Sequence, residues 1–208
     1  MRFFAKSVAG LIAGLAATVA LVAVGCGTSP PSPATPTAGA PLPLSGPSPA
    51  ATRPVGAGCG FIPTRGAGSF GSISGQRVVK AASGNPQLSV FTSAIRSAAL
   101  GGELDRMKSF TMFVPVNSAF AALDKSDISF LRKQSNLVQV VRRQVVPTRI
   151  TPARMARGGS VTTLAGSKLT LGKSGGAYRV DQATVVCGNI KASNGTIYVI
   201  DRVLLPPR

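Results

Sequence analysis

The stretch FTMFVPVNSAF (residues 110–120) contains a short apolar run followed at once by the start of a helix. Phe110 and Phe113 bracket the core of a predicted buried strand, and Pro115 ends it because proline has no backbone N–H to donate to a sheet. Asn117 is a favoured capping residue, and we expect it to begin a helix that carries Phe120 inward. The stretch therefore predicts a strand that passes directly into a helix.

A second stretch, NGTIYVIDRVLLPP (residues 194–207), has the pattern of a turn followed by a strand. Asn194 and Gly195 form a dipeptide typical of a tight hairpin turn. Ile200 lies in the apolar part of the strand, and Asp201 is predicted to accept hydrogen bonds from backbone N–H groups. We predict that the residues of both stretches belong to the scaffold and do not contact a ligand.

Helical patterns come first along the chain and strand patterns come last. Asn85 is a capping residue followed by proline, and the apolar residues after it repeat at helical spacing. Residues 126–146 are predicted to be helical with a break near 134–136, and Thr151 is predicted to cap a short helix that ends in glycine. The remaining sequence alternates between apolar and polar residues with glycine punctuation, which predicts an antiparallel meander. A helical half and a strand-rich half indicate an α+β domain.

The composition is strongly basic and contains no histidine. Among 208 residues, Lys and Arg number 23 against 6 Asp and Glu, which gives a net charge of +17. Such a charge implies polyanionic surroundings, such as a membrane surface, an acidic polysaccharide or nucleic acid. The absence of histidine removes the commonest general base and the commonest metal ligand. No Ser-x-x-Lys spacing occurs either, which disfavours Ser–Lys catalysis.

Neither the glycine-rich motif nor the acidic residues indicate a cofactor or metal site. The G-x-G-x-x-G pattern at residues 66–71 lacks the acid expected about 20 residues later in a dinucleotide site. The six acids are scattered along the sequence: Glu103, Asp105, Asp124, Asp127, Asp181 and Asp201. We therefore predict no catalytic residue, no cofactor and no metal ion, and we do not expect an enzyme.

The N-terminal segment has the pattern of a secretory signal. Arg2 and Lys6 precede a run of 18 uncharged residues, as in a signal peptide. Residues 23–26, Ala-Val-Gly-Cys, resemble the lipobox of bacterial lipoproteins, which implies cleavage before Cys26 and a lipid on its sulfur. The alternative is an uncleaved membrane helix, because the apolar run just reaches the length needed to span a bilayer. Either anchor predicts a location at the bacterial cell membrane, on its extracytoplasmic face.

Residues 27–58 form a proline-rich segment. Nine of the 16 prolines fall here, together with Ser, Thr, Ala, Gly and the single charge of Arg53. Such a segment cannot bury a core, and we expect a flexible and extended spacer. The predicted organisation is a signal peptide at 1–25, a lipidated cysteine and linker at 26–58, and a folded domain at 59–208.

The two remaining cysteines, Cys59 and Cys187, both lie in the predicted domain. In an oxidising compartment an even pair of cysteines suggests a disulfide. This disulfide would join the start of the domain to its C-terminal region. Two free thiols are the alternative, which is disfavoured outside the cell.

The two quoted stretches resemble the two signatures of the fasciclin (FAS1) domain family, in the family's order and spacing over residues 72–207. The lipobox, the proline-rich spacer and the cysteine pair also resemble the single-FAS1 surface lipoprotein antigens of mycobacteria. The resemblance implies one FAS1 domain of the α+β class, with an antiparallel β-wedge or sandwich flanked by several short helices. It also implies display at the cell surface and a role in adhesion.

The family's Tyr-His pair is replaced by Arg143-Gln144, within a basic run. Integrin recognition, which is linked to that pair in animal relatives, is therefore not carried over to this chain. Between residues 128 and 180 there are ten basic residues and no acid. Helical spacing predicts that the pairs at 132–133 and 142–143 project outward. The predicted basic face consists of Arg132, Lys133, Arg142, Arg143, Arg149, Arg154 and Arg157.

Two functions fit these observations. The first is a lipid-anchored adhesion or interaction module that contacts host matrix or a host receptor protein. The second is an envelope protein that binds acidic wall or membrane polymers through the basic face, although this face also fits a merely solvated surface. Nucleic acid is not an expected partner, because the chain lies outside the cytoplasm and has two tyrosines and no tryptophan for base stacking. No prediction of oligomeric state is made.

Overall fold

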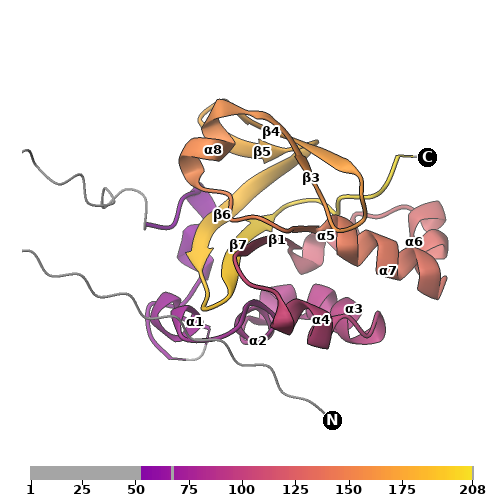
Figure 1. Ribbon diagram of the computed structural model, residues 1–208, viewed down its shortest axis with the longest axis horizontal. Helices are drawn as coiled ribbons and strands as arrows, with labels where there is room; N and C mark the ends of the chain where they lie inside the picture. Colours follow the sequence, from indigo (N-terminus) through magenta and orange to yellow (C-terminus); the bar gives the residue numbers. More distant parts are fainter. Residues whose placement is uncertain (1–52, 67, 208) are drawn as a thin grey trace, which may run out of the picture. The chain divides into compact units, whose positions relative to one another are not determined.

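The computed structural model describes residues 53–66 and 68–207 (Figure 1). The predicted signal peptide, the lipid attachment at Cys26 and nearly all of the predicted linker lie outside the described residues. Within the described ranges, no helix combines the length and the apolar character needed to cross a membrane.

A seven-stranded sheet forms the centre of the domain, in the order β2-β1-β7-β6-β5-β4-β3. All neighbouring strands are antiparallel except β1 and β7, which are parallel. The α+β prediction is confirmed, and the one parallel pair is a departure from the expected antiparallel sheet. The strands are β1 (Phe110–Pro115), β2 (Val145–Val146), β3 (Gly159–Thr162), β4 (Lys168–Ser174), β5 (Ala177–Val180), β6 (Ala183–Lys191) and β7 (Gly195–Ile200).

The parallel pair is buried on both faces, because it separates two apolar clusters. Met112 and Ile197 point into the cluster shared with the helices, whereas Phe113 and Tyr198 point into the cluster shared with β3, β4 and β5. Every residue of β1 and β7 is buried. A strand in this position contains a nearly continuous apolar run instead of an alternating pattern, which explains the sequence of both stretches.

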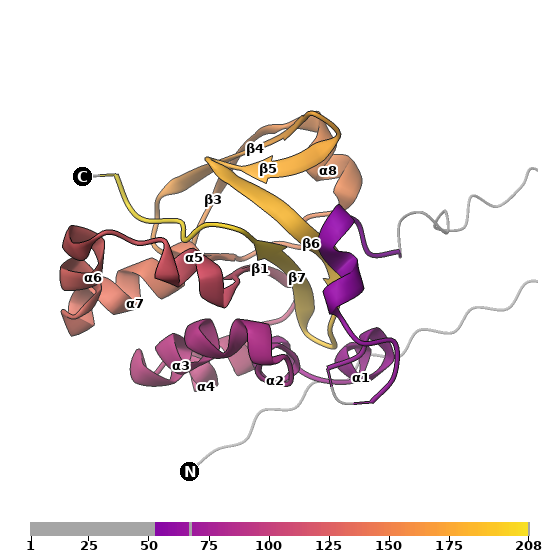
Figure 2. The same ribbon diagram turned by 180° about the vertical axis from the view of Figure 1, so that it is seen from behind.

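Helices cover the sheet from two sides. Figure 1 and Figure 2 show α1 to α4 below the sheet, whereas α8 lies at the top beside β4 and β5. The helices are η2 (Ala57–Phe61), α1 (Phe70–Ser74), α2 (Val78–Ser83), η3 (Pro86–Leu88), α3 (Ser89–Ser97), α4 (Gly101–Arg106), α5 (Asn117–Ala121), α6 (Lys125–Leu131), α7 (Gln134–Arg143) and α8 (Pro152–Arg157).

Two predicted helix caps are confirmed, and one predicted break between helices lies at a slightly different position. Asn85 accepts a hydrogen bond from the backbone N–H of Gln87, and Thr151 accepts one from Arg154, as predicted. The break between α6 and α7 lies at residues 132–133, slightly before the predicted position. The helix boundaries were thus predicted to within a few residues, but the helical prediction for Val145 and Val146 is wrong, because these two residues form β2 and pair with β1.

Asn117 does not cap its own helix, and this prediction is wrong. Val116 occupies the capping position of α5, and Asn117 is the first helical residue. Its side-chain oxygen instead accepts from the backbone N–H of Val90 at 3.0 Å, and its amide donates to Pro86 O at 2.9 Å. Asn117 therefore satisfies the first turn of α3 across a tertiary contact, which joins the end of β1 to the helical layer.

A disulfide joins Cys59 in η2 to Cys187 in β6, as the sequence predicts. Beside it, Val55 and Gly188 exchange two backbone hydrogen bonds. The backbone carbonyl of Arg53 also accepts from the side chain of Asn189 in β6 at 2.7 Å. Contacts with the sheet are thus present from Arg53, a few residues before the predicted start of the domain at residue 59.

Replacing both Cys59 and Cys187 with alanine is expected to lower the free energy of unfolding substantially. The disulfide closes a loop with a sequence separation of 128 residues, and the chain-entropy estimate for such a loop is about 4–5 kcal/mol. Urea denaturation of the double variant, compared with the oxidised chain, measures this loss. An unchanged unfolding midpoint would show that the crosslink does not restrain the unfolded chain.

Candidate functional site

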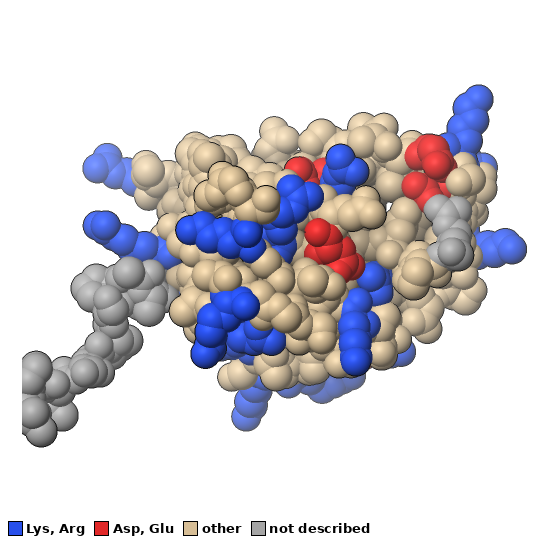
Figure 3. Space-filling view, turned by 90° about the horizontal axis from the view of Figure 1, so that it is seen from above, with Lys and Arg blue, Asp and Glu red and all other residues tan. Residues whose placement is uncertain are grey.

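The predicted basic face is divided in the structure. Arg132 and Lys133 are exposed between α6 and α7, whereas Arg157 is exposed at the end of α8. Figures 1 and 2 both place α6 and α8 at opposite ends of the domain. Seen from above in Figure 3, Lys and Arg side chains form several separate groups, with Asp and Glu between some of them. The seven predicted residues therefore do not form one binding surface.

Arg143 is buried, and the prediction that it projects outward is wrong. Its guanidinium lies 2.9 Å from a carboxylate oxygen of Asp181 and donates to the hydroxyl of Ser167 at 2.5 Å. The other oxygen of Asp181 accepts from the backbone N–H of Thr170. Arg143 therefore joins the end of α7 to the turns around β4 and β5, which is a structural role.

Two further members of the predicted face are engaged in local contacts. Arg142 forms an ion pair with Glu103 of α4 at 2.9 Å, in which the side chains are 38% and 40% exposed. The guanidinium of Arg154 donates to the backbone carbonyls of Gly158 and Ser160, beyond the end of α8. Arg149, in contrast, is exposed and lines a cavity.

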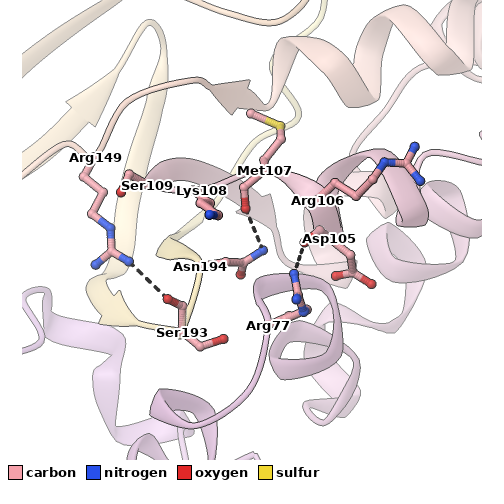
Figure 4. A pocket seen from close by; sticks show the side chains of 9 residues that line it. All are labelled: Arg77, Asp105, Arg106, Met107, Lys108, Ser109, Arg149, Ser193 and Asn194. Atoms are coloured by element: carbon pink, nitrogen blue, oxygen red, sulfur yellow. Dashed lines mark hydrogen bonds between the residues drawn. The ribbon is translucent and has the colours of Figure 1, made fainter. Parts of the chain in front are cut away.

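This cavity, of about 750 Å³, lies beside the turn between β6 and β7 (Figure 4). We call it the turn cavity. Its cationic side chains come from three segments that are far apart in the sequence: Arg77, Arg106, Lys108 and Arg149. Only Arg149 was among the predicted binding residues, because the other three lie outside the basic run. Asp105 is the single acid in the lining.

Asn194 fixes the base of the turn cavity. Its buried side chain accepts from the backbone N–H of Val78 at 2.9 Å, and it donates to Leu104 O at 3.2 Å and Met107 O at 3.3 Å. One amide thus connects the start of α2 with the end of α4. The sequence motif that contains Asn194 is the one signal that could have pointed to this site.

The predicted hairpin is present, because antiparallel β6 and β7 are joined by a tight turn in which the backbone N–H of Ala192 donates to Gly195 O at 3.0 Å. Gly195 is also needed for a close approach. A Cβ at this position would lie 2.7 Å from a methyl group of Val78 and 2.8 Å from Phe110 O. The residue itself does not take a left-handed conformation. Besides its place in the hairpin, the Asn194-Gly195 pair therefore allows β7 to pack closely against α2 and β1.

The cations of the turn cavity are not neutralised by ion pairs. Among the described residues, the ion pairs are Arg142–Glu103 and Arg143–Asp181, and neither involves a lining residue. Arg149 donates to Ser193 O at 3.5 Å, and Arg77 donates to the backbone carbonyl of Asp105. Burial, and secondarily the charge of Arg149, lower the pKa of the neighbouring Lys191 ammonium. The lining therefore holds four cations against the single carboxylate of Asp105, and none of the four is held in an ion pair among the described residues.

A second cavity, of about 840 Å³, lies between α5, β6 and the C-terminal segment. Its lining includes the Arg143–Asp181 pair, Asp201 and Leu204. Asp201 accepts from the backbone N–H of Thr184 at 2.7 Å, as predicted. Arg143, Asp181 and Asp201 are thus bonded to the scaffold, and the larger number of exposed cations makes the turn cavity the better candidate for binding an anion.

The remaining signature residues lie in the scaffold. Phe110, Phe113 and Ile200 are fully buried, Pro115 is the last buried residue of β1, and Phe120 packs against the helical cluster. Within the described part of the chain, no three His, Cys, Asp or Glu side chains gather closely enough to hold a metal ion. The chemistry of the turn cavity is that of N–H and O–H donors with positive charge.

Comparison with known proteins identifies related sequences across most of the chain. The family model described as "Fasciclin domain" matches residues 86–206. Immunogenic protein MPB70 of Mycobacterium bovis is 37% identical over 74% of this chain and 82% of its own length. The cell surface glycolipoprotein MPB83 of the same species is 31% identical over 94% of both chains.

Relatives and solved structures extend beyond mycobacteria. Protein sll1483 of Synechocystis is 39% identical over 64% of this chain and 76% of its own length. A FAS1 domain pair from the insect cell adhesion molecule Fasciclin I superposes with a TM-score of 0.52 at 16% identity, over 65% of this chain. This chain spans about half of that structure (52%), and the likeness shows a shared fold.

Arg142 and Arg143 are neighbours in sequence, but we expect them to differ sharply in their effect on stability. Arg143→Met removes the buried member of the Arg143–Asp181 pair and leaves the partly buried Asp181 without its partner, which is expected to cost about 3 kcal/mol. Arg142→Met removes a half-exposed pair and is expected to cost less than about 1 kcal/mol. Urea denaturation of the two variants measures the difference, and equal losses would contradict the structural role of Arg143.

Proposed function

Because the chain belongs to the fasciclin domain family, we propose that it is a lipid-anchored, non-enzymatic interaction protein of the cell surface. It presents one FAS1 domain on a proline-rich stalk and is held at the membrane through a lipid on Cys26. Its role is adhesion to, or recognition of, a partner outside the cell.

The observation that carries this proposal is the extent of the match to the glycolipoprotein MPB83. The match covers 94% of this chain, and the unmatched remainder is shorter than the segment that precedes Cys26. It therefore includes Cys26 and the proline-rich segment, and it extends well beyond the fasciclin domain. That relative is a cell surface glycolipoprotein, which agrees with the lipobox pattern of this chain.

The Cys59–Cys187 disulfide supports export of the domain. Disulfides persist in oxidising compartments and are rare in the cytosol. The bridge lies where the chain enters the domain, because Cys59 is in η2 and Cys187 is in β6. A crosslink at the N-terminal end of the domain secures the end through which the domain would be attached to its anchor.

The first candidate for the partner is a host matrix or receptor protein, and the second is an acidic polymer of the bacterial envelope. The turn cavity favours an anionic partner, because its lining holds four cations and one acid. The predicted seven-residue basic face does not contribute to this choice, since its members are separated.

Replacing Cys26 with alanine is expected to move the chain from the membrane fraction to the soluble or secreted fraction. Acylation adds about 0.8 kcal/mol of membrane affinity for each buried CH₂ group, and its loss removes the anchor. Cell fractionation with immunodetection measures the shift, and Thr28→Ala is the matched control that keeps the cysteine. Retention of the Cys26 variant in the membrane would favour an uncleaved helix.

A second measurement tests display at the surface. Protease added to intact cells is expected to remove the domain, whereas a cytoplasmic protein in the same cells remains intact. Protection of the domain in intact cells, with cleavage only after lysis, would contradict a role in contacts outside the cell.

A further inference from the structure

The turn cavity collects positive charge from segments that the fold brings together. In Figure 4, Arg149 and Arg77 lie on opposite sides of the turn that contains Ser193 and Asn194, and Arg106 lies beyond Arg77. Arg106 is the last residue of α4, and Lys108 follows two positions later in the chain. All four cations are exposed, so that their charged groups can reach a ligand from solvent.

These cations retain hydrogen-bonding capacity. A guanidinium has five N–H donors, and Arg149 uses one of them in a long contact of 3.5 Å to Ser193 O. Arg77 donates to a backbone carbonyl and not to a carboxylate. An anion in the cavity would form charge-assisted hydrogen bonds with these groups and relieve their mutual repulsion.

The remaining lining residues indicate the kind of anion. Met107 is the only large apolar residue in the lining, and no aromatic side chain is present there. Nucleobases bind single-strand sites by stacking on aromatic side chains, and protein partners bury apolar or aromatic anchors. The turn cavity offers neither surface.

Hydroxyl groups and size point to a hydrated ligand larger than a simple ion. Ser109 and Ser193 are exposed and can exchange hydrogen bonds with sugar hydroxyls. The volume of about 750 Å³ lies within the range of about 300–1,000 Å³ typical of sites for small organic ligands. One or two sugar units with attached anionic groups have this size and chemistry.

We propose that the turn cavity binds an acidic polysaccharide, whose carboxylate or sulfate groups contact Arg106, Lys108 and Arg149. This inference deepens the proposed function and rests on it for the location of the domain outside the cell. Its chemistry rests on the cavity alone.

Asp105 opposes such a ligand and therefore provides a sensitive test. It is the one acid in the lining, and its Oδ1 atom is buried without a hydrogen-bond partner. An approaching anion is repelled by this carboxylate. We expect Asp105→Asn to tighten binding, whereas a purely structural role of the cavity predicts no gain.

The experiment measures binding of the full chain, purified in detergent, to two probes by titration calorimetry. A heparin oligosaccharide supplies sulfates, an oligogalacturonate supplies carboxylates, and a neutral dextran oligosaccharide is the control ligand. The Arg106→Gln/Lys108→Gln variant is compared with Arg132→Gln/Lys133→Gln. Both pairs are exposed, and both variants lose two positive charges.

We expect saturable binding of at least one acidic probe and no binding of the neutral dextran. A difference between the two acidic probes distinguishes sulfate from carboxylate recognition. The Arg106→Gln/Lys108→Gln variant is expected to bind at least about tenfold more weakly, because the loss of one charge-assisted hydrogen bond has this effect. The Arg132→Gln/Lys133→Gln control is expected to lose much less affinity. Equal losses in both variants, or no binding of either acidic probe, would overturn the proposal. Equally tight binding of polyglutamate would overturn the assignment to sugars.

Failure of this inference is distinguishable from failure of the proposed function. Membrane release of the Cys26 variant and protease access on intact cells do not depend on the turn cavity. A chain that is displayed at the surface but binds no acidic sugar would refute the inference alone.

Discussion

Six residues of β1 lie in parallel register with six residues of β7, from Phe110 opposite Gly195 to Pro115 opposite Ile200. The two sequence signatures are therefore halves of one structural element. At one end of this pair, Asn194 connects α2 and α4 through three hydrogen bonds. Because the pair is buried on both faces, the remaining strands and helices are arranged around it.

The same pairing determines where the turn cavity forms. Gly195 allows β7 to approach Val78 closely, and Asn194 holds the backbone at Leu104 and Met107. The segments that carry Arg77 and Lys108 are thereby fixed relative to the β6–β7 turn. A site whose backbone is held in this way loses little conformational freedom on binding, which favours affinity. The scaffold signature thus also positions the residues of the proposed binding site.

The sequence was informative where the signal was local. The apolar runs, the caps at Asn85 and Thr151, and the two signatures were sufficient for the α+β class and the family. The parallel pairing could not be derived from periodicity, because a strand buried on both faces has no alternation. Asn117 was misassigned as the cap of its own helix because its hydrogen-bond partners, Pro86 in η3 and Val90 in α3, belong to other helices.

The proposed binding site was less predictable than the fold because its residues meet only in three dimensions. Helical spacing placed Arg143 outward, but its partner Asp181 lies in a turn that is remote in sequence. The turn cavity combines Arg77, Arg106 and Arg149 from separate segments, so that no local charge run reveals it. The most direct test is backbone amide chemical-shift mapping of the full chain, titrated with an acidic oligosaccharide. We expect the shifts to concentrate at residues 105–109, Arg149 and Ser193. Shifts concentrated at Arg132 and Lys133 instead would contradict the assignment of the anionic ligand to the turn cavity.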